Sequence, residues 1–392
     1  MTTFEAEQTT IAFKAPGTVE WQPLATPADG DEAKKNDAKR NKNELNDKLL
    51  ASLQMQHLVV LAGSGCSRSA SGPSMLDLWN YAVGKEPTDA ARAVATKVRH
   101  DLANENIEAF LSRIEAFLHV NEDEDTTAFL KSSKQVILSK CTEFLKIDKL
   151  EAHKTFLHRL SRRRVRDQRL KVFTTNYDLC FEWAASELGG VALDGFSFAA
   201  PRRYDSRFFS YDIIRRHRSG DDLGDYLEGV FLLFKLHGSV NWARVNGTII
   251  EKDKPEPDEA CLIYPASGKY QQSFTQPHLE SMAQFLAAVR EPNTCVLAVG
   301  FGFNDDHLAE PLLAAAKSNP HLRLIIADPG ARANAETGNG YWKQFFDLGA
   351  RGEDIWFVAA GFEDFARMIP DLKSLTPADS LMRALQAVTR ER

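Results

Sequence analysis

Hydrophobic residues gather in short unbroken runs along the chain, separated by stretches in which apolar and polar residues alternate. The most prominent run leads directly into glycines and hydroxyls, LVVLAGSGCS at 58–67. An unbroken apolar run of this length is typical of a strand covered on both faces of a sheet. Comparable runs, each predicted as a strand, lie at 170–174, 230–236, 261–264, 294–299, 322–327 and 355–358.

Helical spacing of apolar residues fills most of the sequence between these runs. Leucines recur at helical intervals just before the first run, and several helices are predicted over about 75–165 and near 276–290. The dipeptide Asn246-Gly247 predicts a β-hairpin. Strands that alternate with helices, with polar residues collected where the strands end, predict an α/β fold built on a doubly wound parallel sheet.

The expected organisation has three parts. Residues 1–43 mix Thr, Pro, Gly and alternating charges, which predicts a flexible N-terminal arm. A single α/β domain is expected at 44–375 and a C-terminal helix at 376–392. Within the domain we expect a helical insertion at about 75–165 and an irregular insertion, rich in Arg, Tyr and Asp, at about 201–228.

Composition limits the classes of protein to consider. The 392 residues are 43% hydrophobic and carry a formal charge of -6, which argues against a surface devoted to nucleic acid. No apolar stretch approaches bilayer length and the N-terminus has no export signal, so we expect a cytoplasmic protein without membrane contact. Five widely spaced cysteines predict free thiols and no cysteine zinc site.

A run of six arginines in eleven residues, at 159–169, has two interpretations. It either binds phosphate or nucleic acid, or it forms a solvated helix face or an interface that pairs with acidic residues. The second is favoured, because one basic run inside an acidic protein does not make a groove. Contact with nucleic acid is therefore expected only indirectly.

Candidate chemistry collects where four of the predicted strands end. The motifs there are GSGCS from Gly63, TTNYD from Thr174, HGS from His237 and GFGFNDDH from Gly300. In parallel sheets these carboxyl ends share one edge, where ligands bind. Glycines allow close backbone approach and serines can donate to an anionic group, although GSGCS alone also fits an ordinary turn and the GxGxxG spacing is absent.

In this order the four motifs resemble the Sir2 family, specifically the prokaryotic Sir2-like branch found in anti-phage defence. The resemblance covers roughly residues 45–370 and implies a Rossmann-like, NAD-binding catalytic domain with a small helical module. The chain lacks the four-cysteine zinc module of the family's protein deacylases, so no zinc ribbon and no metal are expected. It also lacks the deacylases' arginine after the first loop, has Gly302 in place of a serine, and has Cys66 in place of a small apolar residue.

Carried over by position, the resemblance implies a role for each motif residue. The first loop would hold phosphates through Gly63, Ser64, Gly65 and Ser67. The phosphate and ribose side would be lined by Gly300, Gly302 and Asp305, and the adenosine ribose would be bound by Asp328. Nicotinamide and its ribose would be held by Asn176 and Asp178, and the ribose hydroxyls would be acted on by His237.

The residue types suit this chemistry independently of the family. Asn176 offers both a donor and an acceptor, and a histidine such as His237 titrates near neutrality and can accept a proton. We therefore expect Asn176 and His237 to be the catalytic pair. The remaining histidines are expected to be structural: His57, His100, His119, His153, His158, His217, His278, His307 and His321.

The resemblance implies an NAD+ hydrolase that releases nicotinamide and ADP-ribose and depletes NAD during abortive infection. A HerA-like ATPase is the expected partner, with a short Argonaute as the alternative, and a homo-oligomer is expected. The alternatives are a non-catalytic NAD or ADP-ribose sensor, which does not need His237, and an NAD-dependent protein deacylase, which the missing zinc module disfavours. A nuclease lacks a metal-carboxylate cluster in the sequence.

Overall fold

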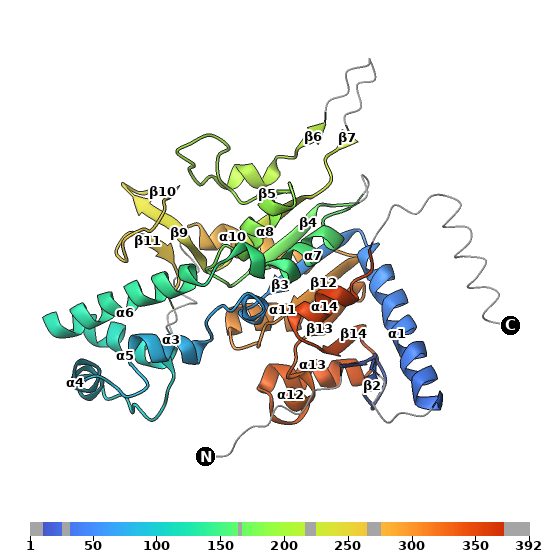
Figure 1. Cartoon of the computed structure of the whole chain (residues 1–392), viewed down its shortest axis with the longest axis horizontal. Helices are drawn as coiled ribbons and strands as arrows, with labels where there is room; N and C mark the ends of the chain where they lie inside the picture. The colour runs from blue at the N-terminus through green and yellow to red at the C-terminus, as the bar shows by residue number, and fades with distance from the viewer. Residues whose placement is uncertain (1–10, 26–31, 164–166, 216–224, 265–275, 372–392) are drawn as a thin grey trace.

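A computed structural model of the protein describes residues 11–25, 32–163, 167–215, 225–264 and 276–371 (Figure 1). Its centre is a nine-stranded sheet in the order β2-β1-β14-β13-β12-β3-β4-β8-β5. Seven of these strands run parallel to one another: β3 (His57–Ala62), β4 (Leu170–Thr174), β5 (Val191–Leu193), β8 (Val230–Lys235), β12 (Thr294–Val299), β13 (Leu322–Ala327) and β14 (Ile355–Ala359). The predicted α/β fold with a parallel sheet is confirmed.

The strand order reverses between β3 and β12. From β3 the chain continues to β4 and β8 on one side, and from β12 it continues to β13 and β14 on the other. Ligands of doubly wound sheets bind in the crevice outside the carboxyl ends of the strands at such a reversal. The loops that follow β3 and β12 are the two glycine-rich motifs, so the fold brings them to this position.

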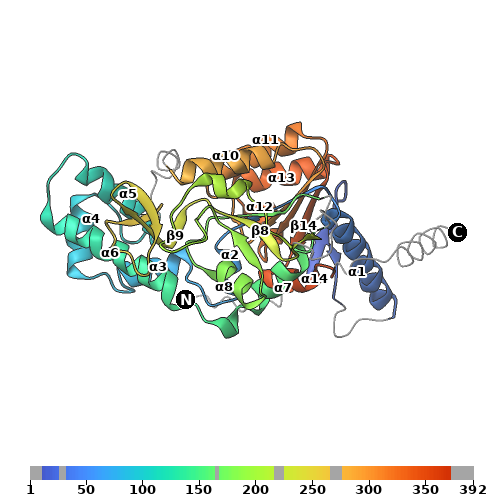
Figure 2. The ribbon, with the colours of Figure 1, turned by 90° about the horizontal axis from the view of Figure 1, so that it is seen from above.

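Helices cover both faces of the sheet (Figure 2). On one face lie α1 (Glu32–Leu53), α7 (Glu151–Leu160), α8 (Cys180–Glu187) and α14 (Phe362–Met368), and on the other α10 (His278–Ala288), α11 (Asp306–Ser318), α12 (Ala331–Thr337) and α13 (Gly340–Ala350). Alternate residues of β3 enter the two cores, Val60 on the first face and Val59 and Leu61 on the second. Burial on both faces explains why the run carries no polar residue.

Four helices form a separate module with its own core: α3 (Met75–Ala82), α4 (Asp89–Lys97), α5 (Ile107–Leu118) and α6 (Glu124–Glu143). Each begins at a side chain that accepts a hydrogen bond from a backbone amide of the first turn, as Ser74 does from Asp77 in a capping box. These helices lie within the segment expected to be helical. In contrast, α7 packs on the sheet, against α8 and α14.

A three-stranded antiparallel sheet lies between the central sheet and the helical module. Its order is β10 (Thr248–Glu251), β9 (Gly238–Val245), β11 (Ala260–Leu262). Asn246 and Gly247 have positive φ at the turn between β9 and β10, so the predicted hairpin is confirmed. The apolar run at 261–264 was expected to continue the α/β alternation. Instead β11 pairs with β9, because the hairpin offers it a free edge.

The flexible arm expected at 1–43 is wrong for much of its length. β1 (Ala12–Lys14) pairs antiparallel with β14, β2 (Gln22–Pro23) pairs with β1, and α1 already begins at Glu32. Phe13 is fully buried and stacks on Trp356 at 5.8 Å. Two strands this short leave almost no periodic pattern, so the polar composition around them dominated the prediction. Residues 1–10 lie outside the described residues.

Two other expected segments are described only in part. The insertion at 201–228 contains the 3-10 turn η2 (Ser206–Ser210) and the paired strands β6 (Ile214–Arg215) and β7 (Asp225–Tyr226). Phe209 of η2 stacks on Phe234 of β8 at 4.2 Å, which anchors the insertion to the sheet. A second 3-10 turn, η1 (Ile147–Lys149), precedes α7. The C-terminal helix predicted at 376–392 lies outside the described residues.

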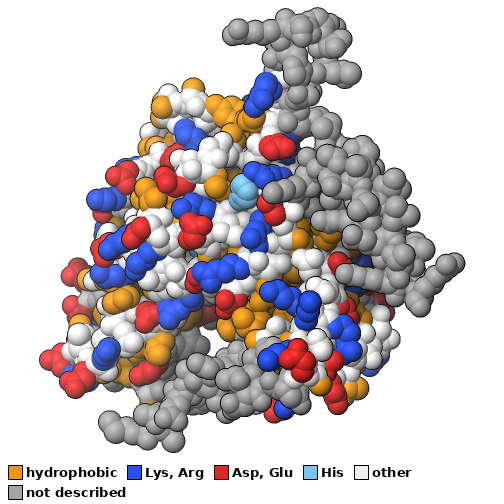
Figure 3. Space-filling model, turned by 45° about the vertical axis from the view of Figure 1, so that its right-hand side comes forward, with side chains coloured by type: hydrophobic (Ala, Val, Ile, Leu, Met, Phe, Trp, Pro, Cys, Tyr) orange, Lys and Arg blue, Asp and Glu red, His pale blue; other side chains and the backbone are white. Residues whose placement is uncertain are grey.

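Three members of the arginine run hold the fold together. Arg159 donates to the carbonyl oxygens of Ala366 and Arg367, at the end of α14, at 3.0 and 2.6 Å. The buried Arg163 donates to carbonyl oxygens just after α1, and Arg169 pairs with Asp212 at 2.9 Å. Basic and acidic side chains are interspersed over the face in Figure 3. The structure therefore supports internal pairing, mostly with backbone carbonyls, over a phosphate-binding patch.

All five cysteines are buried and free, as expected. Within the described ranges, no helix combines the length and apolarity needed to cross a bilayer.

Candidate functional site

A cavity of about 160 Å³ opens at the carboxyl ends of β3, β4, β8 and β12, where the sheet meets the helical module. Eight of the predicted site residues line it: Gly63, Ser64, Ser67, Asn176, Asp178, His237, Gly302 and Asp305. The other three predicted site residues are not among the described residues that line the cavity: Gly65, Gly300 and Asp328. The fold thus brings together residues that are up to 242 positions apart, from Gly63 to Asp305.

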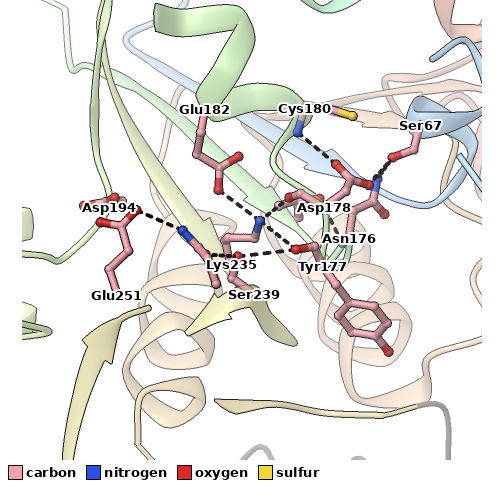
Figure 4. A network of polar contacts seen from close by, with 12 residues as sticks. Ser67, Asn176, Tyr177, Asp178, Cys180, Glu182, Asp194, Lys235, Ser239 and Glu251 are labelled. Atoms are coloured by element: carbon pink, nitrogen blue, oxygen red, sulfur yellow. Dashed lines mark hydrogen bonds and ion pairs between the residues drawn. The ribbon is translucent and has the colours of Figure 1, made fainter. Parts of the chain in front are cut away.

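Ser67, Asn176 and Asp178 form one buried hydrogen-bond network (Figure 4). Asn176 Nδ2 donates to Ser67 Oγ at 2.8 Å and to the carbonyl oxygen of Gly63 at 3.0 Å. Ser67 Oγ donates to Asp178 Oδ2 at 2.5 Å, and the other oxygen of Asp178 accepts from the Cys180 amide at 3.0 Å. Asp178 and Ser67 therefore hold the two loops together, in addition to any role toward a ligand.

Lys235 anchors the Asn176–Asp178 loop through backbone carbonyl oxygens (Figure 4). Its side chain is 1% exposed and donates to the carbonyl oxygens of Tyr177, at 3.2 Å, and Asp178, and to Glu182 Oε1 at 2.9 Å. A buried ammonium is tolerated only with such partners. Lys235 was not among the predicted site residues, although a lysine within the apolar run at 230–236 was the available signal.

His237 follows β8 and faces a second histidine. Its Nε2 lies 3.1 Å from Nε2 of His307, and the two rings are tilted by 32°. Gly238 has a φ of +79°, and a Cβ there would lie 2.2 Å from the carbonyl oxygen of Cys261, so only glycine fits after this histidine. His307 was expected to be structural. The structure places it in the first turn of α11, which begins at Asp306, with its ring against that of His237.

The glycines of the two loops contact each other instead of all facing the cavity. A Cβ on Gly63 would lie 2.4 Å from the carbonyl oxygen of Gly300, and one on Gly65 would lie 2.6 Å from its Cα. The Gly65 amide donates to the Gly300 carbonyl at 3.0 Å. Gly65 and Gly300 were expected to contact a ligand, but the structure places them against each other and not in the lining of the cavity. Because they lack side chains, the two loops can meet where the strand order reverses.

Asp328 lies at the end of β13 and caps its own loop. Its Oδ1 accepts from the Gly330 amide at 2.7 Å, and burial raises the pKa of its carboxyl. Asp328 was predicted to lie with the other site residues, but it is not among the described residues that line the cavity.

Residues 170–346 match the family described as SIR2-like domain. The matched segment makes up less than half of the chain. The match runs from the start of β4 into α13 and includes Asn176, His237 and His307. A comparison with curated proteins finds no match to the chain.

Several solved structures are similar to this chain at low identity. One is a mutant Sir2 homologue in complex with 2′-O-acetyl ADP ribose, with 11% identity, a TM-score of 0.44, and coverage of 84% of this chain and 98% of that one. A Sir2 homologue–NAD complex has 13% identity, a TM-score of 0.43 and coverage of 88% and 95%. Sir2 bound to an acetylated peptide has 10% identity, a TM-score of 0.41 and coverage of 82% and 96%.

Further residues of the SIR2-like domain and of the helical module line the cavity without having been predicted. Tyr177 donates its hydroxyl to the Ile263 carbonyl oxygen at 2.6 Å, Asn304 follows Gly302 in the second glycine loop, and Glu108 comes from the first turn of α5. Glu108 belongs to a different part of the sequence from every motif. Only the docking of the helical module on the sheet brings its carboxylate here.

Two thiols beside the SIR2-like site are poor nucleophiles. Burial raises the pKa of Cys66 well above its ordinary value and raises the pKa of Cys141 to about 12. Both are therefore protonated at neutral pH, and the thiolate is the reactive form. Cys66 also donates to the carbonyl oxygen of Val299 at 3.3 Å. Histidine and amide chemistry is available at this site, whereas attack by these cysteines is not.

Proposed function

We propose that the protein is an NAD+ hydrolase that cleaves the bond between nicotinamide and ribose. The observation that carries the proposal is that Asn176 and His237, from the ends of the neighbouring strands β4 and β8, line one cavity within a SIR2-like domain. In the reaction the C1′–N bond breaks, nicotinamide leaves with the bonding electrons, and a water oxygen bonds to C1′ and loses a proton. The products are nicotinamide and ADP-ribose.

Asn176 is held in a fixed orientation that suits a binding role. Both acceptors of its Nδ2 are buried within the protein, and its Oδ1 has no hydrogen-bond donor among the residues that the structure describes. That oxygen is available to accept from the nicotinamide amide or from the attacking water. Breaking the glycosidic bond develops oxocarbenium character at C1′, so orientation of the leaving group and the water lowers the barrier.

His237 supplies the proton acceptor. A ring nitrogen within reach of the ribose hydroxyls or the water can take up the proton that the reaction releases. His307 shares hydrogen bonding with that ring and so restricts its orientation. Protein deacylation is less well supported, because the five buried, scattered cysteines cannot form the zinc module of deacylases.

The size of the cavity bears on how the substrate enters. At about 160 Å³ it is smaller than ligand pockets generally are, about 300–1,000 Å³. It accommodates part of a dinucleotide, and the helical module or a neighbouring loop must move to admit the whole molecule. The wall that must give way includes Met75 and Leu78 of α3 and Glu108 of α5.

We further propose that NAD cleavage serves anti-phage defence, in an oligomer with a HerA-like ATPase or, alternatively, a short Argonaute. The support is the resemblance of the motif set to the defence branch. Exposed aromatic and aliphatic side chains of the 198–214 region, Phe198, Tyr211 and Ile214, offer an assembly surface. Large apolar side chains that stay exposed together are typical of interaction sites.

The test measures nicotinamide release from NAD by the purified chain, alone and with a candidate ATPase. We expect Asn176→Ala and His237→Ala each to lower the rate by about 100-fold or more, the usual effect of losing a positioned catalytic group. Asn121→Ala and His321→Ala remove the same side chains at exposed positions and should leave the rate unchanged. NAD that binds but stays intact under every condition would instead establish the sensor function.

A further inference from the structure

We propose that His237, His307 and Asp305 form a binding site for a divalent transition metal ion at the edge of the cavity. One donor atom from each residue lies within 4.8 Å of the others. Both histidines are buried, and Asp305 is half-buried. No metal was expected because the chain lacks the cysteine spacing of a zinc module, whereas these ligands come from two strand exits 70 positions apart.

The separation of the two imidazoles fits a shared ion. Donor atoms about 2.0–2.1 Å from one ion, at angles of about 90–110°, lie about 2.9–3.4 Å from each other. The Nε2 atoms of His237 and His307 are 3.1 Å apart. Without an ion, one Nε2–H donates to the other nitrogen. A modest rotation of the rings, whose planes already differ by 32°, turns both lone pairs toward a common point.

Asp305 supplies the third donor and balances charge. Its carboxylate oxygen lies within 4.8 Å of both imidazole donors, whereas two donors on one ion are at most about 4.3 Å apart, so a small rotation is enough to bring it onto the ion. A half-buried side chain at the N-cap of α11 has room for this rotation. The N-terminus of a helix disfavours a cation, but the negative charge of Asp305 offsets this.

The donor set indicates the class of ion. Two imidazoles and one carboxylate suit Zn²⁺, Co²⁺, Fe²⁺ or Ni²⁺, whereas Ca²⁺ and Mg²⁺ prefer oxygen donors. His237 and Asp305 also line the cavity, so the ion keeps an open position toward it. Such an ion binds the lone pair of His237 that would accept a proton during NAD cleavage. We therefore expect occupancy to inhibit that reaction, a consequence that rests on the proposed function.

The site is tested by titrating Co²⁺ into the full chain after chelator treatment and following its visible absorption bands. We expect one tightly bound ion per chain, displaced by Zn²⁺, and an affinity at least tenfold weaker in His307→Ala and in Asp305→Asn. Asp306→Asn and His321→Ala make the same changes at exposed positions and should bind as the unaltered chain does. Thermal melting of each variant shows whether it is folded. If His307→Ala does not fold, the affinity of Asp305→Asn for Co²⁺ tests the site by itself.

Three outcomes overturn the proposal. The first is the absence of stoichiometric binding, and the second is equal binding by all variants. The third is a cobalt–thiolate charge-transfer band, which places the ion on a cysteine. The binding measurement requires no NAD cleavage. A chain that binds Co²⁺ but releases no nicotinamide therefore refutes only the proposed function, and one that releases nicotinamide without binding Co²⁺ refutes only the metal site.

Discussion

At the scale of single residues, a buried lysine holds the loop that carries two of the residues facing the cavity, Asn176 and Asp178. Lys235 contacts the backbone of Tyr177 and Asp178 from the strand that ends two residues before His237. It therefore couples the position of Asn176 to that of His237. We consider Lys235 a positioning residue, since it is not one of the described residues that line the cavity.

Replacing Lys235 should separate stability from geometry. Lys235→Met leaves Glu182 without its buried partner, which costs about 3–5 kcal/mol. Adding Glu182→Leu removes the unpaired carboxylate and should restore most of the stability measured by urea unfolding. Nicotinamide release should stay low in the double variant, mainly through kcat, because the two carbonyls remain unanchored. Recovery of the rate together with the stability would show that Lys235 is only structural.

At the scale of elements, the site depends on direct contact between two loops. The loops after β3 and β12 meet where the strand order reverses, and backbone atoms of Gly63, Gly65 and Gly300 touch there. Gly300 also adopts a φ of +56°, which side chains disfavour. Ser67 and Asp305 project toward one cavity from these two loops, so their separation is set by how closely the backbones approach.

Gly63→Ala tests this contact. The added methyl would lie 2.4 Å from the Gly300 carbonyl oxygen and 2.7 Å from Phe301 Cα, so the loops must move apart. We expect a loss of about 1–3 kcal/mol in the free energy of unfolding, as for overpacked cores, and a fall of at least tenfold in nicotinamide release. Gly361→Ala is the matched control, because a methyl there meets no atom of the described chain within 4 Å. Equal melting temperatures for both variants would contradict the argument.

At the scale of the whole molecule, the folded state holds two histidines in a neutral form. His153 of α7 is fully buried between Phe181 and Phe362, and neither of its ring nitrogens has a hydrogen-bond partner within the described part of the chain. Burial lowers the pKa of His153 from 6.5 to about 4 and does the same for His278 on the opposite face of the sheet. Both layers of helices are thus sensitive to acid.

The expected result is a loss of stability as the pH falls from about 6.5 to 4. The unfolded chain takes up these protons near pH 6.5, whereas the folded chain resists them until about pH 4. Each histidine lowers the free energy of unfolding by roughly 3 kcal/mol over this window. A hydrogen bond from Lys97 lowers the pKa of Asp123 to about 2. Protonation of Asp123 therefore reduces the stability of the fold only below pH 3.8, outside this window.

Urea unfolding from pH 7 to 4.5 measures this dependence. His153→Phe should flatten the pH dependence, since phenylalanine carries no proton and fits between two aromatic rings. His321→Phe, at an exposed position, should keep the dependence of the unaltered chain. An unchanged slope in His153→Phe would show that His153 does not contribute.

Much of the central sheet was predictable because a doubly covered parallel strand leaves an unbroken apolar run. Errors arose where local pattern is weak. β1 and β2 are three and two residues long and are stabilised by pairing with β14, not by their own sequence. The apolar run of β11 resembles those of the central strands, but β11 pairs with β9 in the three-stranded sheet. The site motifs were found because parallel strands deliver their carboxyl-end residues to one edge.

The α/β class, the strands that carry the motifs and the residue types at their ends could be predicted from the sequence, since these follow from periodicity and from backbone geometry within each segment. Which of those residues meet depends on tertiary packing. Packing brings His307 against His237, Lys235 against the carbonyl oxygens of Tyr177 and Asp178, and Glu108 to the cavity, and it brings Gly65 and Gly300 into contact. These contacts join segments far apart in the chain, so no local pattern records them.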